Sequence, residues 1–244
     1  MKSHRLIALL LASTLSVVAP AAPLELEAKI PLGDVRGRID HLAVDLKRHR
    51  LYVAELGNDS VGVVDLNARN TVRTLLGLKA PQGIGYVPST DTLYIANAGD
   101  GSVRLFQGED LDPIGQIALG EDADNVRVDD AVHRIFIGYG DGALAVIDTA
   151  SRRKIADIAL GAHPESFQLE RSGEHIVVNV PDRHEIAYVD REANKQVASW
   201  STNNMRANFP LALDETHQRA LAVFRRPATI GFFLTCKTID SSRR

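Results

Sequence analysis

The residues of this chain best suited to chemistry are polar side chains that recur just before a series of similar apolar segments. Eleven residues before each of four such segments stands a carboxylate or an amide, namely Asp40, Gln82, Asp124 and Glu165. The next position along the chain holds His41, Gly83, Asn125 and Ser166. Carboxylate, amide, imidazole and hydroxyl groups can hold a polar ligand by hydrogen bonds, bind a metal ion or transfer a proton. Which of these they do depends on whether the fold brings them together.

The elements that must position these residues are near copies of one segment. Residues 93–106, with the sequence LYIANAGDGSVRLF, contain two short runs of β-branched and aromatic residues around a tight turn. Asp100-Gly101 in that turn predicts a type I′ hairpin, because both central residues of this turn need a positive φ. Copies begin at Leu51, Ile135 and Ile176, and a divergent one begins at Leu221. The spacing of 41 to 45 residues predicts a repeat architecture.

Each repeat has room for four short antiparallel strands, so the predicted fold is all-β, a β-propeller of four-stranded blades. The propeller domain is residues 23–244, and about five blades are expected, at residues 38–79, 80–121, 122–162, 163–205 and 206–244, the last of them degenerate. Residues 24–32 alternate in polarity and are expected to form a strand that closes the last blade. No stretch of useful length in the mature chain has the period of a helix, which argues against folds that alternate strands with helices.

Three aspartates close the third strand of their repeats, and each is followed by a polar turn. They are Asp65, Asp148 and Asp190. A carboxylate at this position is expected to accept hydrogen bonds from N–H groups of the turn. A calcium site is the alternative, but the turns lack a clustered set of oxygen ligands.

The composition is that of an ordinary globular protein. The chain has 244 residues, of which 45% are hydrophobic and 24% charged, with a net charge of −3. Without a clustered basic face, nucleic acid is not an expected partner. Cys236 is the one cysteine, so no internal disulfide can form.

The first 22 residues have the pattern of a secretory signal peptide. Lys2, His4 and Arg5 precede an uncharged apolar run at residues 6–18, and Ala19-Pro20-Ala21 supplies small residues for cleavage. A membrane-spanning helix needs about 20 apolar residues, so this run is short for an anchor. We therefore expect cleavage after Ala21, a periplasmic or secreted protein, and no membrane span after cleavage.

The repeats resemble a known family. The Tyr-Val-Ala and Tyr-Ile-Ala strands at residues 52–54 and 94–96, followed by Gly-Asn-Asp-Ser-Val and Gly-Asp-Gly-Ser-Val hairpins, are similar to the YVTN-type repeats of YncE-like bacterial β-propellers. The resemblance covers about residues 24–230 and implies an exported propeller, typically of seven blades and without an assigned activity. This chain has four good repeats and part of a fifth. A shortened version of a longer parent is the expectation, and a five-bladed ring closed by residues 24–32 is the alternative.

In a propeller the innermost strand of each blade lines the central channel, so the residues at its start lie at one channel mouth. The predicted ligand-binding residues there are Asp40, His41, Gln82, Asp124, Asn125, Glu165, Ser166 and Asn208. Polar groups that converge on a shared cavity are what a ligand site needs. The alternative left open is a wet, polar rim with turn residues and no ligand.

The predicted function is that of an exported, non-catalytic binding or scaffold propeller, whose partner is an unidentified small molecule or periplasmic protein. No catalytic residue and no cofactor are assigned. A metal ion held by Asp40, His41, Asp124 and Glu165 stays open. The alternative functions are a metal-dependent propeller enzyme of the lactonase or lyase kind, or an accessory subunit of a periplasmic quinoprotein dehydrogenase system.

We expect the exported protein to begin at Ala22, because the small residues at positions 19 and 21 fit the cleavage site of a secretory signal. Amino-terminal sequencing of protein recovered from the periplasm or the medium measures this. Recovery of chains that still begin with Met1 would contradict the prediction.

Overall fold

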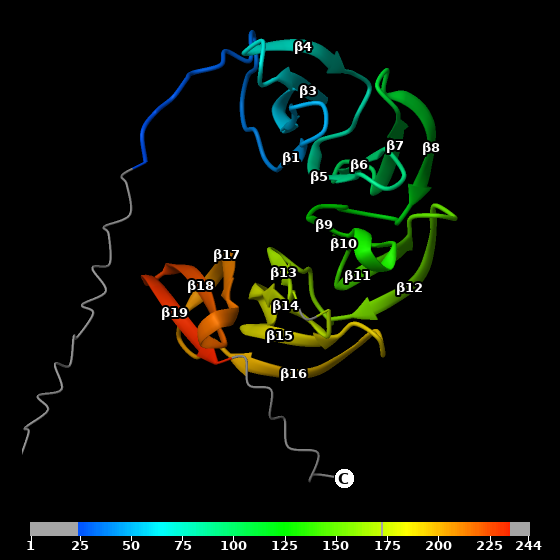
Figure 1. Ribbon diagram of the computed structural model, residues 1–244. Coiled ribbons are helices and arrows are strands. Elements are labelled where there is room, and N and C mark those ends of the chain that lie inside the picture. Colours follow the sequence, from blue (N-terminus) through cyan, green and yellow to red (C-terminus); the bar gives the residue numbers. More distant parts are fainter. Residues whose placement is uncertain (1–23, 172, 235–244) are drawn as a thin grey trace, which may run out of the picture.

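Antiparallel sheets arranged side by side around a common axis make up this protein (Figure 1). The computed structural model describes residues 24–171 and 173–234, so the signal-peptide prediction and Cys236 lie outside the described residues. Within that part there are five sheets, four with four strands and one with three. The predicted all-β propeller fold is confirmed. No helix of the described residues is long and apolar enough to cross a membrane.

Each sheet is one blade, and its strands follow one another in chain order. The first two blades consist of β1 (Leu42–Asp45), β2 (Arg50–Glu55), β3 (Ser60–Asp65), β4 (Asn70–Leu75), and β5 (Pro81–Val87), β6 (Thr92–Asn97), β7 (Ser102–Gln107), β8 (Asp112–Ala118). The next two consist of β9 (Val126–Asp129), β10 (Arg134–Tyr139), β11 (Ala143–Asp148), β12 (Arg153–Ala159), and β13 (Phe167–Leu169), β14 (His175–Val180), β15 (Glu185–Asp190), β16 (Lys195–Ser201). The fifth consists of β17 (Arg206–Asp214), β18 (Arg219–Arg226) and β19 (Ala228–Leu234).

The apolar core is divided among the interfaces between neighbouring blades. Four clusters of buried residues join the first blade to the second, the second to the third, the third to the fourth and the fourth to the fifth. In the first of them Tyr52 and Val63 pack with Ile84 and Ile95 of the next blade. Because side chains alternate between the two faces of a strand, each sheet has two apolar faces and needs a neighbour on each.

The turns that join the strands depend on aspartate side chains, as predicted. Asp65 Oδ1 accepts hydrogen bonds from the N–H groups of Asn67 and Ala68 at 2.8 and 2.7 Å. Asp148 and Asp190 do the same for the turns that follow them. These bonds satisfy turn N–H groups that have no partner in the sheet.

The prediction of a type I′ turn at Asp100-Gly101 is wrong. β6 ends at Asn97 and β7 begins at Ser102, so four residues connect them and the tight two-residue geometry is not required. Of the two residues, only Gly101 has a positive φ, of 62°. The Asp100 carboxylate instead accepts a hydrogen bond from the N–H of Ser102 at 3.0 Å.

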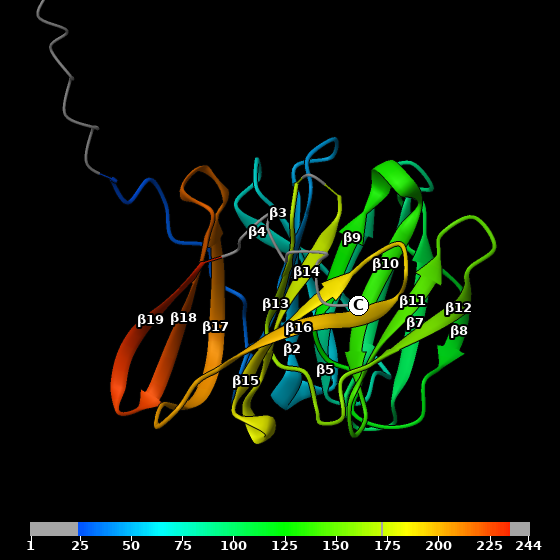
Figure 2. The same cartoon turned by 90° about the horizontal axis from the view of Figure 1, so that it is seen from below.

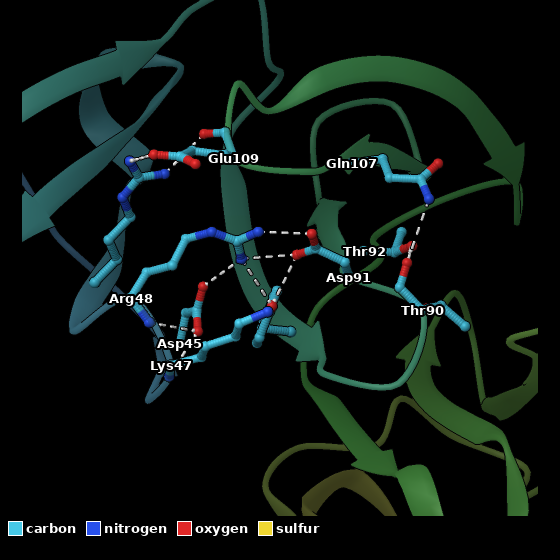
Figure 3. Close-up of polar contacts among 10 residues, drawn as sticks. Asp45, Lys47, Arg48, Thr90, Asp91, Thr92, Gln107 and Glu109 are labelled. Carbon is cyan, nitrogen blue, oxygen red and sulfur yellow. Dashed lines mark hydrogen bonds and ion pairs between the residues drawn. The ribbon is translucent and has the colours of Figure 1, made fainter.

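Polar contacts join neighbouring blades near the C-terminal ends of the inner strands. Arg48, in the β1–β2 turn, reaches across to the second blade (Figure 3). Its Nη1 lies 2.8 Å from Oδ2 of the fully buried Asp45, and its Nη2 lies 2.7 Å from Asp91 Oδ2. Ser89 bonds to Asp130, Arg191 to Asp129 and Arg171 to Glu215 across the following interfaces. Each pair of neighbouring blades is therefore fixed by a polar contact as well as by apolar packing.

The strand predicted at residues 24–32 is not formed, and this segment does not pair with the fifth blade. It has no regular secondary structure. Glu27 pairs with Arg69 at 2.8 Å, and the Thr71 hydroxyl donates to Pro31 O at 3.5 Å, so the segment runs beside β4 of the first blade. The segment lies beside the edge strand β4 without pairing with it as a strand, and the fifth blade lies across the opening of the arc (Figure 1).

No closed ring is present in the described residues, and the two end blades leave apolar side chains exposed. β19 is the outermost strand of the fifth blade (Figure 2). Its side chains alternate: Phe233 packs against the fourth and fifth blades, whereas Ile230, Phe232 and Leu234 are 54%, 61% and 68% exposed. On the first blade Leu42 and Val44 are exposed. Apolar faces of this kind favour self-association.

We expect the described chain to self-associate, and expect Ile230→Lys combined with Phe232→Lys to weaken this, because the two charges replace the exposed apolar face of β19. Sedimentation velocity over a range of protein concentrations measures it. Ala228→Lys combined with Thr229→Lys is the matched control, since it adds the same charge at exposed positions of the same strand. A wild-type chain that stays monomeric at all concentrations would contradict the prediction.

Candidate functional site

A cavity of about 510 Å³ lies where the inner strands of the five blades begin. Every blade contributes to its wall. The lining residues are Arg38, Asp40 and His41 from the first blade, Gln82 from the second, Asp122, Asp124 and Asn125 from the third, His163, Glu165 and Ser166 from the fourth, and Phe209, Pro210 and Arg225 from the fifth. The volume is in the range that holds a small organic ligand.

The structure brings seven of the eight predicted site residues to this one cavity and leaves out the eighth. Asp40, His41, Gln82, Asp124, Asn125, Glu165 and Ser166 line it. Asn208 does not: it is completely buried, and its Nδ2 donates to Asn179 Oδ1 at 3.0 Å and to the carbonyl of Glu185 at 3.3 Å. Its neighbours Phe209 and Pro210 take the place in the wall that was expected for Asn208.

A repeated backbone hydrogen bond places the carboxylates at the start of the inner strands. In three blades the N–H of the residue two positions before the inner strand donates to a carbonyl near the end of the second strand. The bonds run from Asp40 N to Ala54 O, from Asp124 N to Gly138 O and from Glu165 N to Asn179 O, each 2.9 Å long. The same bond in each repeat explains why counting along the repeats found residues that meet in space.

The second and third blades approach each other closely at the cavity, and Gly83 makes this possible. A Cβ at Gly83 would lie 1.8 Å from the carbonyl oxygen of Asp124 and 2.8 Å from Val126 Cγ2. No side chain fits there, so only glycine allows this backbone contact. Between the first two blades the N–H of His41 donates to the carbonyl of Gln82 at 3.2 Å. The inner strands are thus nearly in contact around the cavity wall.

His41 lies between two carboxylates. Its Nε2 is 3.6 Å from Asp40 Oδ1 and 3.6 Å from Asp124 Oδ1. Burial lowers the pKa of His41, and the positive charges of Arg127 and Arg38 act in the same direction, whereas Asp40 opposes them. His41 is therefore neutral at pH 7, and an imidazole in this state can accept or donate a hydrogen bond.

Asp124 is the most strongly perturbed carboxyl group of the cavity. Burial raises its pKa to about 7, and the negative charges of Asp40, Glu165 and Asp122 add to this effect while His163 opposes it. Burial also raises the pKa of Glu165. Perturbed carboxyl groups in a cleft are typical of binding and catalytic sites, although structural ion pairs perturb pKa values as well.

Two buried oxygens in the cavity wall have no hydrogen-bond partner. They are Oδ1 of Asp124 and Oδ1 of Asn125, in residues that are only 8% and 3% exposed. Leaving a buried polar atom unpaired costs about 1–3 kcal/mol. Such atoms in a cavity wall indicate a place where a ligand can supply the missing donor.

Several lining residues were not among the predicted site residues. Arg38 bridges Asp40 and Gln82, with Nη2 at 2.9 Å from each acceptor. His163 donates from Nδ1 to the carbonyl of Gly140 at 2.7 Å. Arg38 and His163 each lie two residues before a predicted site residue, so including the neighbouring positions in the prediction would have found them. Arg225 had no such signal, because it comes from the end of β18 in the divergent repeat.

Arg225 is held in the wall by Phe209. The guanidinium carbon lies 4.2 Å from the centre of the Phe209 ring, a cation–π contact. The cavity therefore has carboxylates from the first, third and fourth blades, and arginines from the first and fifth. Among residues 24–171 and 173–234 no group of three His, Cys, Asp or Glu side chains could hold a metal ion.

The fold and the cavity define the class of protein: a β-propeller with a polar, ligand-sized cavity at one mouth of its channel. Solved structures of other propellers resemble it. The Kuenenia stuttgartiensis hydrazine synthase matches 82% of this chain with a TM-score of 0.71 and 15% identity. The Myceliophteria thermophila Cps50 (Swd1) β-propeller domain matches 84% with a TM-score of 0.64 and 14% identity. Identities this low show the shared fold alone.

This chain spans 59% of the hydrazine synthase chain and 68% of the Swd1 propeller domain. No family model matches the sequence. No curated protein matches it either. The fold is therefore shown by structure, and the YncE-like family remains a resemblance of the repeats.

We expect Asp124→Asn to raise the melting temperature by about 5–10 °C at pH 8 and by roughly a third as much at pH 5. The pKa of Asp124 is about 7 in the folded protein against an ordinary value of 3.8 for an aspartate. Because its pKa is higher in the folded state, the protonated Asp124 carboxyl group contributes to the stability of the fold, and this contribution is fully present below about pH 4. The contribution, on the order of 2–4 kcal/mol, is lost as the pH rises through 7. Thermal unfolding from pH 5 to 8 measures the difference.

Asp112→Asn is the matched control, because Asp112 is exposed at the start of β8 and does not line the cavity. The control should follow the wild-type curve at every pH. Equal stabilities of wild type and Asp124→Asn at pH 8 would show that ionisation of the buried Asp124 carboxyl group does not destabilise the fold.

Proposed function

We propose that this chain is an exported β-propeller protein that binds a small ligand in the cavity at its channel mouth, without catalysing a reaction. One observation carries the proposal: all five blades contribute side chains to one cavity, and two buried oxygens in its wall have no partner. The proposal includes the YncE-like family and, from the pattern of residues 1–22, a periplasmic or secreted location.

A second candidate is acid–base catalysis in the same cavity. The observation that favours it is the neutral His41 imidazole 3.6 Å from Asp124, a carboxyl group whose pKa is about 7. A carboxyl group with a pKa near the working pH and a neutral imidazole can exchange a proton with a bound substrate. Binding is the better-supported function, since it needs only the pairing of polar atoms that the cavity presents.

The proposed function is tested by ligand-observed NMR with mixtures of small polar metabolites. Wild type, the double variant Asp124→Asn with Glu165→Gln, and the control Asp112→Asn are compared at the same protein concentration. We expect some compounds to give saturation-transfer signals with wild type and control that disappear with the double variant. Binding that is equal in all three proteins would overturn the proposal. Conversion of a bound compound during the measurement would favour the catalytic candidate.

A further inference from the structure

The unpaired polar atoms of the cavity wall are all of one kind. Asp124 Oδ1 and Asn125 Oδ1 are both oxygens, both hydrogen-bond acceptors when the carboxyl group is ionised, and both without a donor. Both residues line the cavity although they are only 8% and 3% exposed, so a ligand donor reaches these oxygens with a small shift of the wall side chains. A ligand that completes this part of the wall has to bring N–H or O–H donors rather than acceptors.

The charges around these oxygens favour a cation. Asp40, Glu165 and Asp122 act on Asp124 with the same sign and His163 opposes them, and the repulsion among the carboxylates is relieved when a positive group lies among them. The guanidinium group of Arg127 also interacts electrostatically with Asp124, but it donates to the carbonyl of Val126 and lies over the Phe167 ring. The Arg38 guanidinium is already bonded to Asp40 and Gln82, and it is mostly exposed, with 63% of its side chain accessible. Arg225 lies over Phe209 on the fifth blade. Neither arginine forms a hydrogen bond or ion pair with Asp124 among the contacts of the described residues.

His41 does not supply the missing positive charge. Its Nε2 lies 3.6 Å from Asp124 Oδ1, which is too long for a hydrogen bond, and its lowered pKa keeps the ring neutral. The part of the wall formed by Asp124 and Asn125 thus presents hydrogen-bond acceptors to which no donor of the protein is bonded.

We propose that the cavity recognises an organic cation with N–H donors, an ammonium or guanidinium group, which binds between Asp124, Asn125 and Glu165. The inference rests on the proposed ligand-binding role and names the chemical class of the ligand. A charged donor pairs with a carboxylate by a short, strong hydrogen bond, and the Asn125 amide oxygen accepts a second one. The rest of the ligand occupies the remaining cavity toward Phe209 and Pro210, the apolar part of the wall.

The test is isothermal titration calorimetry of the full chain at pH 8 and low salt with three matched probes. Butylammonium carries a positive charge and N–H donors, tetramethylammonium carries the charge without donors, and butyrate carries a negative charge on a chain of similar size. We expect butylammonium to bind in the millimolar range and tetramethylammonium at least several-fold more weakly. Butyrate should show no cavity-dependent binding.

Variants assign the binding to the cavity. Asp124→Asn should weaken butylammonium binding at least about tenfold, because a charge-assisted hydrogen bond is lost. Glu165→Gln provides a second variant should Asp124→Asn misfold, and circular dichroism checks both. Asp112→Asn, which removes the same charge outside the cavity, should bind like wild type.

Three results would overturn the inference. They are butylammonium binding that is absent, equal affinities for butylammonium and tetramethylammonium, and butylammonium binding that survives both cavity substitutions. Cavity-dependent binding of butyrate, or of neutral compounds in the NMR screen, would reject the cationic ligand while supporting the binding function. A screen without any cavity-dependent ligand would reject the binding function itself, so the two failures are distinguishable.

Discussion

Each blade of this protein has two apolar faces, and the structure depends on covering both. A single small sheet with an uncovered apolar face is barely stable in water, so the repeat cannot fold as an isolated unit. Stacking solves this for the three inner blades, whose faces are buried in the four clusters between neighbours. The same rule leaves the outer faces of the first and fifth blades incomplete, which is why large apolar side chains such as Phe232 are exposed there.

Stacking around an axis also creates the cavity. Blades fan out from the axis, so their inner strands come closest together, and at Gly83 the backbones of the second and third blades are in contact. Residues that precede the inner strands are thereby gathered in a small volume, and Asp124 and Asn125 among them are buried. Burial is the largest cause of the raised pKa values of Asp124 and Glu165, and the same burial leaves Asp124 Oδ1 without a partner. The unusual chemistry of the site follows from the packing that makes the fold.

The sequence predicted the fold class and most of the cavity wall, because a fixed repeat period converts spacing along the chain into position around the axis. Asp40, Asp124 and Glu165 were found by counting, and the same backbone bond holds all three. In the longer fifth repeat the count of eleven residues back from Leu221 gives Pro210, which lines the cavity, whereas the predicted Asn208 lies two positions earlier and is buried. The pairing of β17 with β18 shifts register between Asn208 and Leu211. Pro210, which has no N–H for the sheet, lies in that shift, and Asn208 turns inward. The strand expected at residues 24–32 is absent because alternation of polarity does not specify whether, or with which sheet edge, a segment pairs.

The distribution of charge in the cavity connects the site to the geometry of the arc. Asp122, Asp124 and Glu165 come from the third and fourth blades, each of which packs against a neighbour on both faces. Arg38 and Arg225 come from the first and fifth blades, the two that have only one neighbour. A change in the opening of the arc would move the arginines relative to the carboxylates and alter the field at Asp124, since Coulomb energy in a partly buried site depends steeply on distance. The field at a ligand bound in the cavity would therefore depend on the spacing of the two end blades.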